Sequence, residues 1–252
     1  MRLGAIVSPL GREAAKPAAL ADRARELVGE GFDSLWAVQA IGRGFMVSDP
    51  FITLAVAATA TEDVELGTAI AQVPLYQPAD FAHRVFSTMQ VCGDRLLLGV
   101  GAGSTEKDFD AFERDYSTRF NAFSASMKLL RTFLAEGKTD SVDLSPWPSV
   151  KGGPPLLLGS WGAGVTRAAK HFDGWIASAN YREVDEIIVA HETYRSAGGR
   201  RAIVSTFQIR PGDDLGASQD KLARFADAGF DDAVVLMAPG GPSPAEVRRL
   251  VS

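Results

Sequence analysis

The sequence contains one cysteine, Cys92, and three histidines among 252 residues. A single cysteine excludes an intramolecular disulfide and disfavours a zinc cluster. The histidines, His83, His171 and His191, all fall in segments of helical period, so we expect structural roles for them in the outer parts of the fold. The order of residues suggests no serine–histidine–aspartate or cysteine–histidine arrangement, and we predict no bound metal.

The chain also lacks a long apolar run and an excess of basic residues. No segment approaches the roughly 18 to 20 apolar residues that a membrane span requires. Lysine and arginine number 26 against 31 acidic residues and are scattered, so there is no basic surface for nucleic acid. The apolar part of the first segment, MRLGAIVSPLG, is too short for a secretory leader. We therefore expect a cytoplasmic protein that binds neither nucleic acid nor a membrane.

Hydrophobic residues, by contrast, make up 46% of the chain, and their spacing alternates between two patterns. Runs typical of buried strands cover residues 3–8, 32–38, 64–71, 95–100, 156–159, 174–178, 202–209 and 232–237. Helical periods follow at residues 17–30, 49–60, 78–91, 119–136, 160–171, 183–196, 218–228 and 243–251, with a polar stretch at 101–118. This alternation of eight βα units predicts an α/β fold, a closed (β/α)8 TIM barrel in a single domain, residues 1–252. A doubly wound open sheet is the alternative.

In a barrel of this kind the active site lies where the strands end. The side chains at these ends are mostly small, amide or hydroxyl groups, at Ser8, Gln39, 69–72, 101–104, 160–162, 178–180, Gln208 and Met237. They include neither a pair of carboxylates nor a histidine cluster. This excludes the chemistry of glycosidases and of metal-dependent hydrolases.

Two glycine-rich loops follow expected strands. The first, residues 98–103 (LGVGAG), has a spacing that dinucleotide sites share, but a polar segment follows it where such a site needs a helix. We therefore expect Gly101 and Gly103 to turn the chain tightly. The second, residues 159–164 (GSWGAG), opens a helix, and backbone amides at a helix start favour a phosphate. Either a phosphate site or a simple tight turn accounts for this second loop.

Several fragments in a fixed order resemble one family, the bacterial luciferase-like monooxygenases and oxidoreductases. They are EGFDSLW at 30–36, DPF at 49–51, LGTAI at 66–70, VPL at 73–75, QP at 77–78, RLLLGVGAG at 95–103, PP at 154–155 and DGW at 173–175. The resemblance covers most of the chain. It implies an enzyme that uses reduced FMN or coenzyme F420 to oxidise or reduce a small organic substrate. It also implies a homodimer or higher homo-oligomer and, with FMN, a separate NAD(P)H flavin reductase as partner.

The same resemblance implies where the cofactor binds, across the carboxyl end of the barrel. The residues it assigns to cofactor binding are Thr68, Ala69, Ile70, Gly101, Gly103, Gly159, Ser160, Trp161 and Gly162. A non-proline cis peptide is expected between Ala69 and Ile70. The loop after the fifth strand would hold the cofactor phosphate, which agrees with the interpretation of its glycines.

The sequence departs from the family pattern after the second strand. Many members carry an acid–histidine pair there, whereas this chain has Gln39 and Ala40. Gln39 is the best catalytic candidate, although an amide can hydrogen-bond but cannot titrate. Arg43, Gln72 and Phe109 are candidates for the substrate site or lid; Arg43 would hold an anionic substrate or cofactor tail, or be a solvated loop residue.

Members of the family commonly carry an insertion after the seventh strand that covers the site as a lid. Here this lid is reduced, because only residues 210–216 join the seventh strand to its helix. Aromatic residues between 109 and 123 would cover the site instead, or pack in the core. Two other functions stay open. One is a barrel isomerase or aldolase acting on a phosphorylated metabolite, against which the lack of lysine at the strand ends counts. The other is a non-catalytic flavin-binding relative.

Overall fold

The computed structural model describes residues 1–8, 16 and 18–251. Its strands are β1 (Arg2–Ile6), β2 (Ser34–Ala37), β3 (Glu65–Thr68), β4 (Ala71–Gln72), β5 (Leu96–Gly101), β6 (Leu156–Gly159), β7 (Gly174–Ser178), β8 (Arg201–Ile209) and β9 (Asp232–Met237). All named pairings are parallel and run in the order β3-β2-β1-β9-β8-β7-β6-β5-β4. A further pairing of β3 with β5 closes the sheet. The barrel is therefore confirmed, and an open sheet is excluded.

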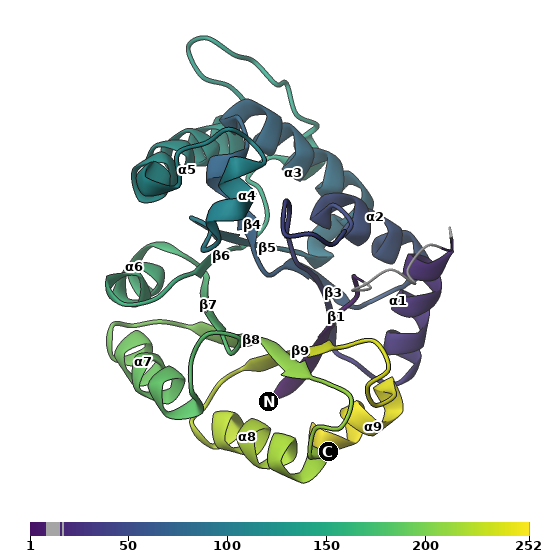
Figure 1. Ribbon diagram of the computed structural model, residues 1–252. Helices are drawn as coiled ribbons and strands as arrows, with labels where there is room; N and C mark the ends of the chain where they lie inside the picture. Colours follow the sequence, from purple (N-terminus) through teal and green to yellow (C-terminus); the bar gives the residue numbers. More distant parts are fainter. Residues whose placement is uncertain (9–15, 17, 252) are drawn as a thin grey trace.

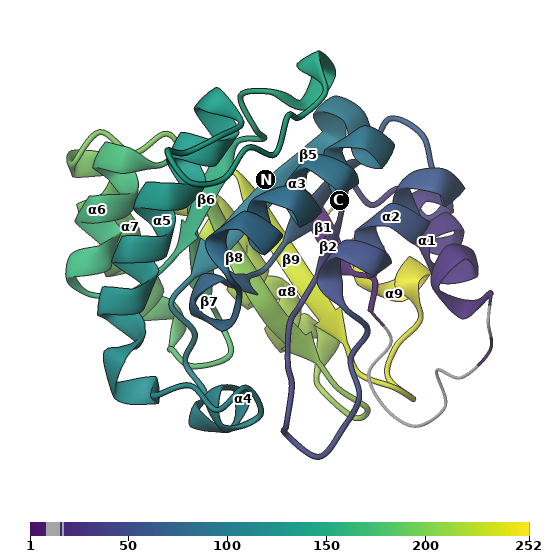
Figure 2. The same cartoon turned by 90° about the horizontal axis from the view of Figure 1, so that it is seen from above.

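Helices surround the barrel on its outer side (Figure 1). They are α1 (Ala19–Gly29), α2 (Pro50–Ala60), α3 (Pro78–Cys92), α4 (Glu106–Asp110), α5 (Arg119–Glu136), α6 (Ala163–His171), α7 (Val184–Ser196), α8 (Leu215–Asp227) and α9 (Pro244–Arg248). Figure 2 shows that α4 and the loop after β2 lie at one end of the barrel. Among the described helices, none is both long and apolar enough to cross a membrane.

The structure differs from the sequence prediction at several element ends and at the following three places. The expected strand 64–71 is two strands, β3 and β4, with the expected cis peptide bond between Ala69 and Ile70 at the break. The polar stretch 101–118 contains the helix α4. The helix expected from residue 218 begins at Leu215, because the Asp214 side chain accepts hydrogen bonds from two amides of its first turn. Pro17, expected in the first helical turn, lies outside the described residues.

Local sequence explains where the helices begin. At α2 the Asp49 carboxylate accepts hydrogen bonds from the amides of Phe51 (2.9 Å) and Ile52 (3.2 Å). Pro50 occupies the first helical position, where its missing N–H leaves no bond unmade. At α9, Ser243 and Glu246 form a reciprocal capping box. At these two helices the cap sets where the preceding loop ends.

The core has two layers. The interior of the barrel is filled by Ile6, Trp36, Leu97, Leu157, Ile176, Ile203, Val234 and Leu236, and a larger apolar cluster lies between the strands and the helices. Trp36 is fully buried, and its Nε1 donates to Ser34 Oγ over 2.8 Å. A Cβ atom on Gly67 would lie 2.3 Å from the Trp36 ring. Glycine is thus required opposite the tryptophan that fills the barrel.

Four charged residues close the amino end of the barrel, and we call them the amino-end ion cluster: Arg2, Glu65, Arg201 and Asp232. Each is the first residue of its strand. Arg201 contacts Glu65 (2.7 Å) and the fully buried Asp232 (2.8 Å), and Arg2 contacts Glu65 (2.6 Å). Burial alone would raise the pKa of the Glu65 carboxyl, but the hydrogen bonds from the two arginines outweigh it and lower that pKa.

The histidines lie in the helical ring, on α3, α6 and α7. His191 is buried, stacks on Phe230 with 4.2 Å between ring centroids, and accepts a hydrogen bond from Arg195 Nε over 3.0 Å. Burial, aided by the Arg195 charge, lowers the pKa of His191 to about 4. The imidazole is therefore neutral near pH 7 and packs as a core residue. In the described part of the chain, no group of side chains could hold a metal ion.

Candidate active site at the carboxyl end of the barrel

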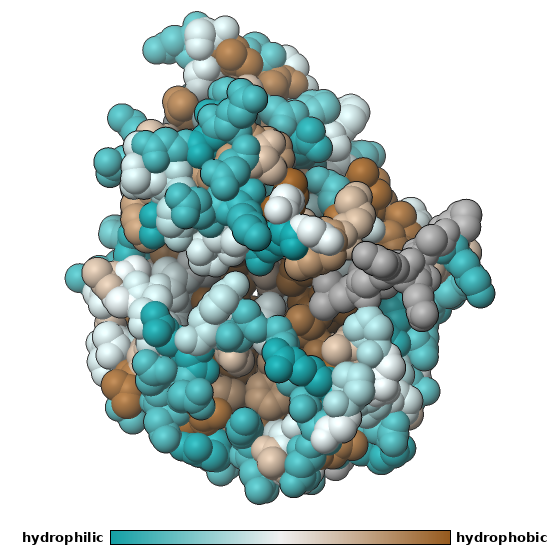
Figure 3. Space-filling model, in the orientation of Figure 1, coloured by the Kyte–Doolittle hydropathy of each residue, from teal (hydrophilic) through white to brown (hydrophobic). Residues whose placement is uncertain are grey.

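The carboxyl ends of the strands surround an apolar floor. Val38, Ala69 and Ile70 are partly buried and pack on the cluster inside the barrel. The Ile70 side chain reaches two glycines: a Cβ on Gly101 would lie 2.8 Å from Ile70 Cδ1, and one on Gly159 would lie 2.6 Å from Ile70 Cγ2. This floor is therefore built from small residues around one isoleucine. Figure 3 shows apolar residues in the hollow at the centre of this face, within a hydrophilic rim.

Thr68 and Gly103 have structural contacts that hold the floor in place. Thr68 Oγ1 is buried and donates to the Gly99 carbonyl over 2.7 Å, which joins β3 to β5. Gly103 has a φ of +84°, and a Cβ there would lie 2.4 Å from Gln72 Oε1 and 2.8 Å from the Phe109 ring. Only glycine fits at this close approach. The first glycine loop is thus a tight turn, as the sequence predicts.

The second glycine loop, residues 159–164, forms the start of α6 and contains an unused polar atom. Ser160 Oγ is buried and has no hydrogen-bond partner in the described chain. The Ser160 carbonyl accepts a hydrogen bond from Trp175 Nε1 over 3.1 Å, which fixes the loop to β7. Gly162 precedes the helix with a φ of +58°, and a Cβ there would meet nothing within 4 Å. The amides of Gly164 and Val165 donate to backbone carbonyls of the same loop, so the loop offers a hydroxyl, open space and the positive end of the α6 dipole, which together fit a phosphate.

A cation stands beside this loop. Trp161 is 37% exposed, and the Arg182 guanidinium lies over its ring, 4.9 Å from the centroid. Trp161 therefore forms the side of the loop that faces the segment after β7. The positive charge of Arg182 adds to the attraction that the helix start exerts on an anion.

Gln39 lies in a buried network and is only 8% exposed. Its Oε1 accepts a hydrogen bond from the Gln72 amide over 2.7 Å, and its Nε2 donates to the Tyr76 hydroxyl over 2.7 Å. Both ends of the Gln39 amide are thus occupied within the protein. Burial raises the pKa of the Tyr76 hydroxyl, so that it stays protonated.

Asp108 is the centre of this network, and sequence reasoning missed it. The fully buried carboxylate of this α4 residue accepts from Arg43 Nε (2.7 Å), Arg43 Nη2 (2.5 Å), Gln72 Nε2 (2.6 Å) and the Ile41 amide (3.2 Å). Burial would raise the pKa of Asp108, but the hydrogen bonds from Arg43, Gln72 and Ile41 outweigh it and lower that pKa. Asp108 thereby joins three segments: the loop that follows β2, the strand β4 and the helix α4.

Arg43 and Phe109 take different roles in this arrangement. The Arg43 side chain is 24% exposed, and its hydrogen bond to Asp108 raises the pKa of the guanidinium. Phe109 is 1% exposed and packs edge-on against Tyr116, with 5.3 Å between centroids. It supports the first glycine loop from beneath. Of the aromatic residues between 109 and 123, Phe109 and Phe123 are buried, whereas Phe112 and Phe120 are exposed.

The loop after β7 extends to the same side of the site through Tyr181. Burial raises the pKa of the Tyr181 hydroxyl, but a hydrogen bond with Ser104 and the charge of Arg43 outweigh it and lower that pKa. Tyr181 therefore lies within reach of the loops after β5 and β2. Sequence reasoning did not single out this tyrosine, because it stands in a polar loop without a recognisable spacing.

Buried polar atoms without partners gather at the carboxyl end. Within the described chain, four of the six such atoms belong to residues at or near this end, Ser8 Oγ, Gln72 Oε1, Ser160 Oγ and Ser205 Oγ. A buried polar group without a partner costs free energy, so such groups are rare in finished cores. Their grouping marks the carboxyl end as the candidate site of the barrel.

The fold and these contacts define a (β/α)8 barrel with a candidate site at its carboxyl end, over an apolar floor and beside a helix start. The family model described as luciferase-like monooxygenase matches residues 3–238. The chain belongs to this family. The resemblance carried by the sequence fragments is thereby confirmed.

Known proteins agree with this assignment. The chain is 26% identical over 220 residues to a 5,10-methylenetetrahydromethanopterin reductase of Methanolobus tindarius, covering 84% of this chain and 65% of that protein. It spans 59% of the length of another curated relative.

Solved structures with the same fold include two with bound cofactors. An F420-dependent secondary alcohol dehydrogenase in complex with an F420–acetone adduct has a TM-score of 0.77 and 15% identity, covering 99% of this chain and 98% of that one. The oxygenating constituent of 3,6-diketocamphane monooxygenase from Pseudomonas putida, in complex with FMN, has a TM-score of 0.75 and 16% identity, covering 100% and 96%. At these identities the likeness establishes the fold.

Proposed function

We propose that this chain is an oxidoreductase that binds reduced FMN or coenzyme F420 at the carboxyl end of its barrel and oxidises or reduces a small organic substrate. The observation that carries the proposal is the unpartnered Ser160 Oγ at the start of α6, beside an apolar floor. The names of similar proteins include F420-dependent and FMN-bound enzymes, which supports this cofactor class. When bound, the cofactor supplies hydride transfer or oxygen activation.

Each part of the proposed site has a distinct task. The loop of Gly159, Ser160, Trp161 and Gly162 holds the phosphate through the Ser160 hydroxyl and the positive end of the α6 dipole. Thr68, Ala69 and Ile70 support one face of the ring system, and the backbone of Gly101 and Gly103 passes close to the cofactor tail. The protein thus provides position and a dry apolar surface.

The network below the loop after β2 has a positioning role. Gln39 holds the Gln72 amide and Tyr76, and Asp108 holds Arg43 and the Gln72 side chain. Gln72 Oε1 is left to accept a hydrogen bond from a ligand. Because the Gln39 amide cannot titrate and is bonded at both its oxygen and its nitrogen, we assign it to orientation of the site rather than to proton transfer.

Two further features belong to this proposal. A small-molecule substrate enters over the reduced lid, and with FMN a separate NAD(P)H flavin reductase supplies the reduced cofactor. We also propose that the protein is cytoplasmic and forms a homodimer or higher homo-oligomer. Phe45 and Met46, which are 48% and 79% exposed in the loop after β2, support a partner subunit at this end.

Titration of the purified protein with FMN and with F420, followed by the fluorescence of each cofactor, tests the proposal. We expect micromolar binding of one of them, which also identifies it. Gly162→Asp should weaken binding by about tenfold or more, since it places an anion against the phosphate and each tenfold corresponds to about 1.4 kcal/mol.

Gly198→Asp is the matched control. Gly198 also has a positive φ, +89°, and open space around it, but it follows α7 away from the site. It should therefore carry a similar backbone strain without the loss of affinity. Binding of neither cofactor to the unaltered protein would overturn the proposal and favour the phosphorylated-metabolite enzyme.

A further inference from the structure

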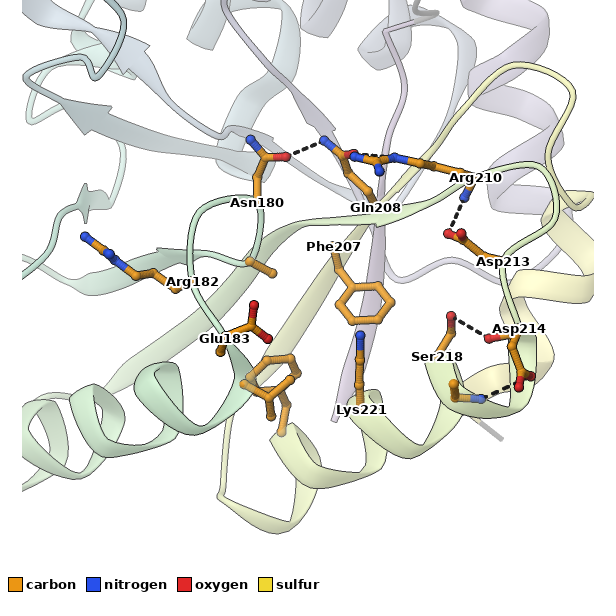
Figure 4. Close-up of a pocket in the computed structure, with 14 residues that line it drawn as sticks. Asn180, Arg182, Glu183, Phe207, Gln208, Arg210, Asp213, Asp214, Ser218 and Lys221 are labelled. Carbon is orange, nitrogen blue, oxygen red and sulfur yellow. Dashed lines mark hydrogen bonds between the residues drawn. The ribbon is translucent and has the colours of Figure 1, made fainter.

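A cavity of about 370 Å³ lies between the loops that follow β7 and β8 (Figure 4). Its upper edge in the figure is a hydrogen-bonded row: Arg210 Nε donates to Gln208 Oε1 (2.9 Å), and Gln208 Nε2 donates to Asn180 Oδ1 (2.5 Å). Asn180 and Gln208 stand where β7 and β8 end. The cavity therefore borders the carboxyl end of the barrel.

The carboxylates of this cavity are already bonded to the backbone. Glu183 takes part in a capping box at the start of α7. Asp213 accepts from the Arg210 amide over 2.8 Å, and Asp214 accepts from the Gly216 amide over 2.8 Å at the start of α8. These hydrogen bonds hold the three carboxylates at the loops and helix starts, and within the described chain none of them forms an ion pair with Lys221.

The cation of α8, in contrast, has no partner. Lys221 rises from the helix into the cavity, toward Phe207 (Figure 4). Within the described chain, neither a hydrogen bond nor an ion pair reaches its ammonium group. Arg182, on the other side of the cavity, places its guanidinium over the Trp161 ring. The cavity thus contains bonded anions and at least one unbonded cation.

Apolar side chains complete the walls. Phe207, Val184 and Phe225 line the cavity together with these charges. A ligand that suits such walls has an apolar body and one anionic end. An ammonium group binds either a carboxylate or a phosphate, because it acts as a point charge with three donors.

We propose that this cavity binds the anionic group, a carboxylate or a phosphate, of the substrate, and that Lys221 is the residue that holds it. The substrate is then an organic anion whose apolar part extends past Asn180 and Gln208 to the reacting centre. This inference rests on the proposed function for the reaction and deepens it by naming the substrate class. The cofactor phosphate has its own place at Ser160, so the two anions do not compete.

The test measures anion binding without cofactor. Inorganic phosphate is titrated into Gly162→Asp protein by calorimetry, since this change removes the α6 loop as a phosphate site. We expect binding that Lys221→Met weakens about tenfold or more, because the charged hydrogen bond is lost. Lys128→Met, which removes an exposed lysine of α5, is the control and should bind phosphate as before.

A second measurement distinguishes the proposed site for the substrate anion, at Lys221, from the proposed site for the cofactor phosphate, at Ser160. FMN and F420 are titrated into Lys221→Met protein that retains Gly162, and cofactor affinity should equal that of the unaltered protein. Equal phosphate binding with and without Lys221 would overturn the proposal, as would a weaker affinity of Lys221→Met for the cofactor. Failure of both cofactors to bind would instead contradict the proposed function, while the phosphate result would still decide the anion site.

Discussion

The two ends of the barrel use polar residues in opposite ways. At the amino end, Arg2, Glu65, Arg201 and Asp232 begin their strands and satisfy one another within one cluster. At the carboxyl end, polar atoms such as Ser160 Oγ and Gln72 Oε1 are buried without partners in the described chain. The barrel thus carries paired charges where four of its strands begin and buried polar atoms without partners near where other strands end.

This difference separates stability from binding. Paired, hydrogen-bonded charges stabilise one another within the protein. A buried polar atom without a partner is stabilised only when a ligand forms a hydrogen bond with it. We therefore expect changes at the amino end to alter unfolding and leave affinity intact. Changes at the carboxyl end should do the reverse.

The largest effect is expected from Arg201→Met. It leaves Asp232, which is fully buried, with only a 3.7 Å contact to Arg2. Removing one partner of a buried ion pair typically costs about 3–5 kcal/mol, and we expect that loss in the free energy of unfolding measured with urea. Cofactor affinity of the folded fraction should stay unchanged. The adjacent Arg200→Met is the control: this arginine is 80% exposed, and its removal should cost less than about 0.5 kcal/mol. Equal losses in both variants would refute a special role for the cluster.

Asp108→Asn tests the buried ion pair that Asp108 and Arg43 form at the carboxyl end. We expect a loss of about 2 kcal/mol in unfolding free energy, less than for Arg201 because the freed Arg43 can reach water. Unlike the amino-end variant, it should also lower turnover, since the loop after β2 loses its attachment to α4. Asp110→Asn, exposed on the same helix, should leave both stability and turnover unchanged. A stable Asp108→Asn protein with full turnover would show that the network is dispensable.

His191 makes the stability of the protein depend on pH. It is linked to the amino end of the barrel through Arg195, which bonds the imidazole and also forms an ion pair with Asp231, the residue before β9. The pKa of His191 is about 4 in the folded protein against 6.5 as the ordinary value. Because the unfolded chain takes up the proton first, stability is fully present above pH ~6.5 and is lost as pH falls toward ~4. Between pH 7 and pH 5 this amounts to about 2 kcal/mol.

Urea unfolding at pH 7 and pH 5 measures this slope. In His191→Gln the titrating group is absent, so the difference between the two pH values should shrink by about the same 2 kcal/mol. His83→Gln, on α3, serves as the comparison and should keep the slope of the unaltered protein. An unchanged slope in His191→Gln would assign the acid sensitivity to other groups.

The amino-acid sequence predicts the barrel and the α6 loop because both depend on local patterns. Alternating apolar periods indicate the strands and helices, and the glycines of residues 159–164 indicate the turn before α6. Asp108 escaped prediction because its burial depends on Arg43 and Ile41, which are 65 and 67 residues away, and on Gln72, which is 36 away. A lone aspartate in a polar stretch carries no sign of such contacts.

The same reason applies to Lys221. In the sequence it is one lysine on the surface side of a helix, and nothing in its neighbours marks it. Its significance comes from the loops after β7 and β8, whose carboxylates are bonded to backbone amides. Those bonds depend on how two separate loops fold, which no periodicity records.

Ser160→Ala is the smallest change and gives the sharpest test of the comparison between the two ends. Its hydroxyl has no partner in the described chain, so removing it should change the unfolding free energy by less than about 0.5 kcal/mol, or stabilise the protein slightly. Cofactor affinity, measured by fluorescence, should fall about tenfold, because a hydrogen bond to a charged phosphate is worth about 1.5–3 kcal/mol. Ser87→Ala, an exposed serine of α3 whose hydroxyl bonds its own helix, should change neither quantity. A loss of stability without a loss of affinity in Ser160→Ala would place this serine with the amino-end residues, and the two ends would then no longer differ in kind.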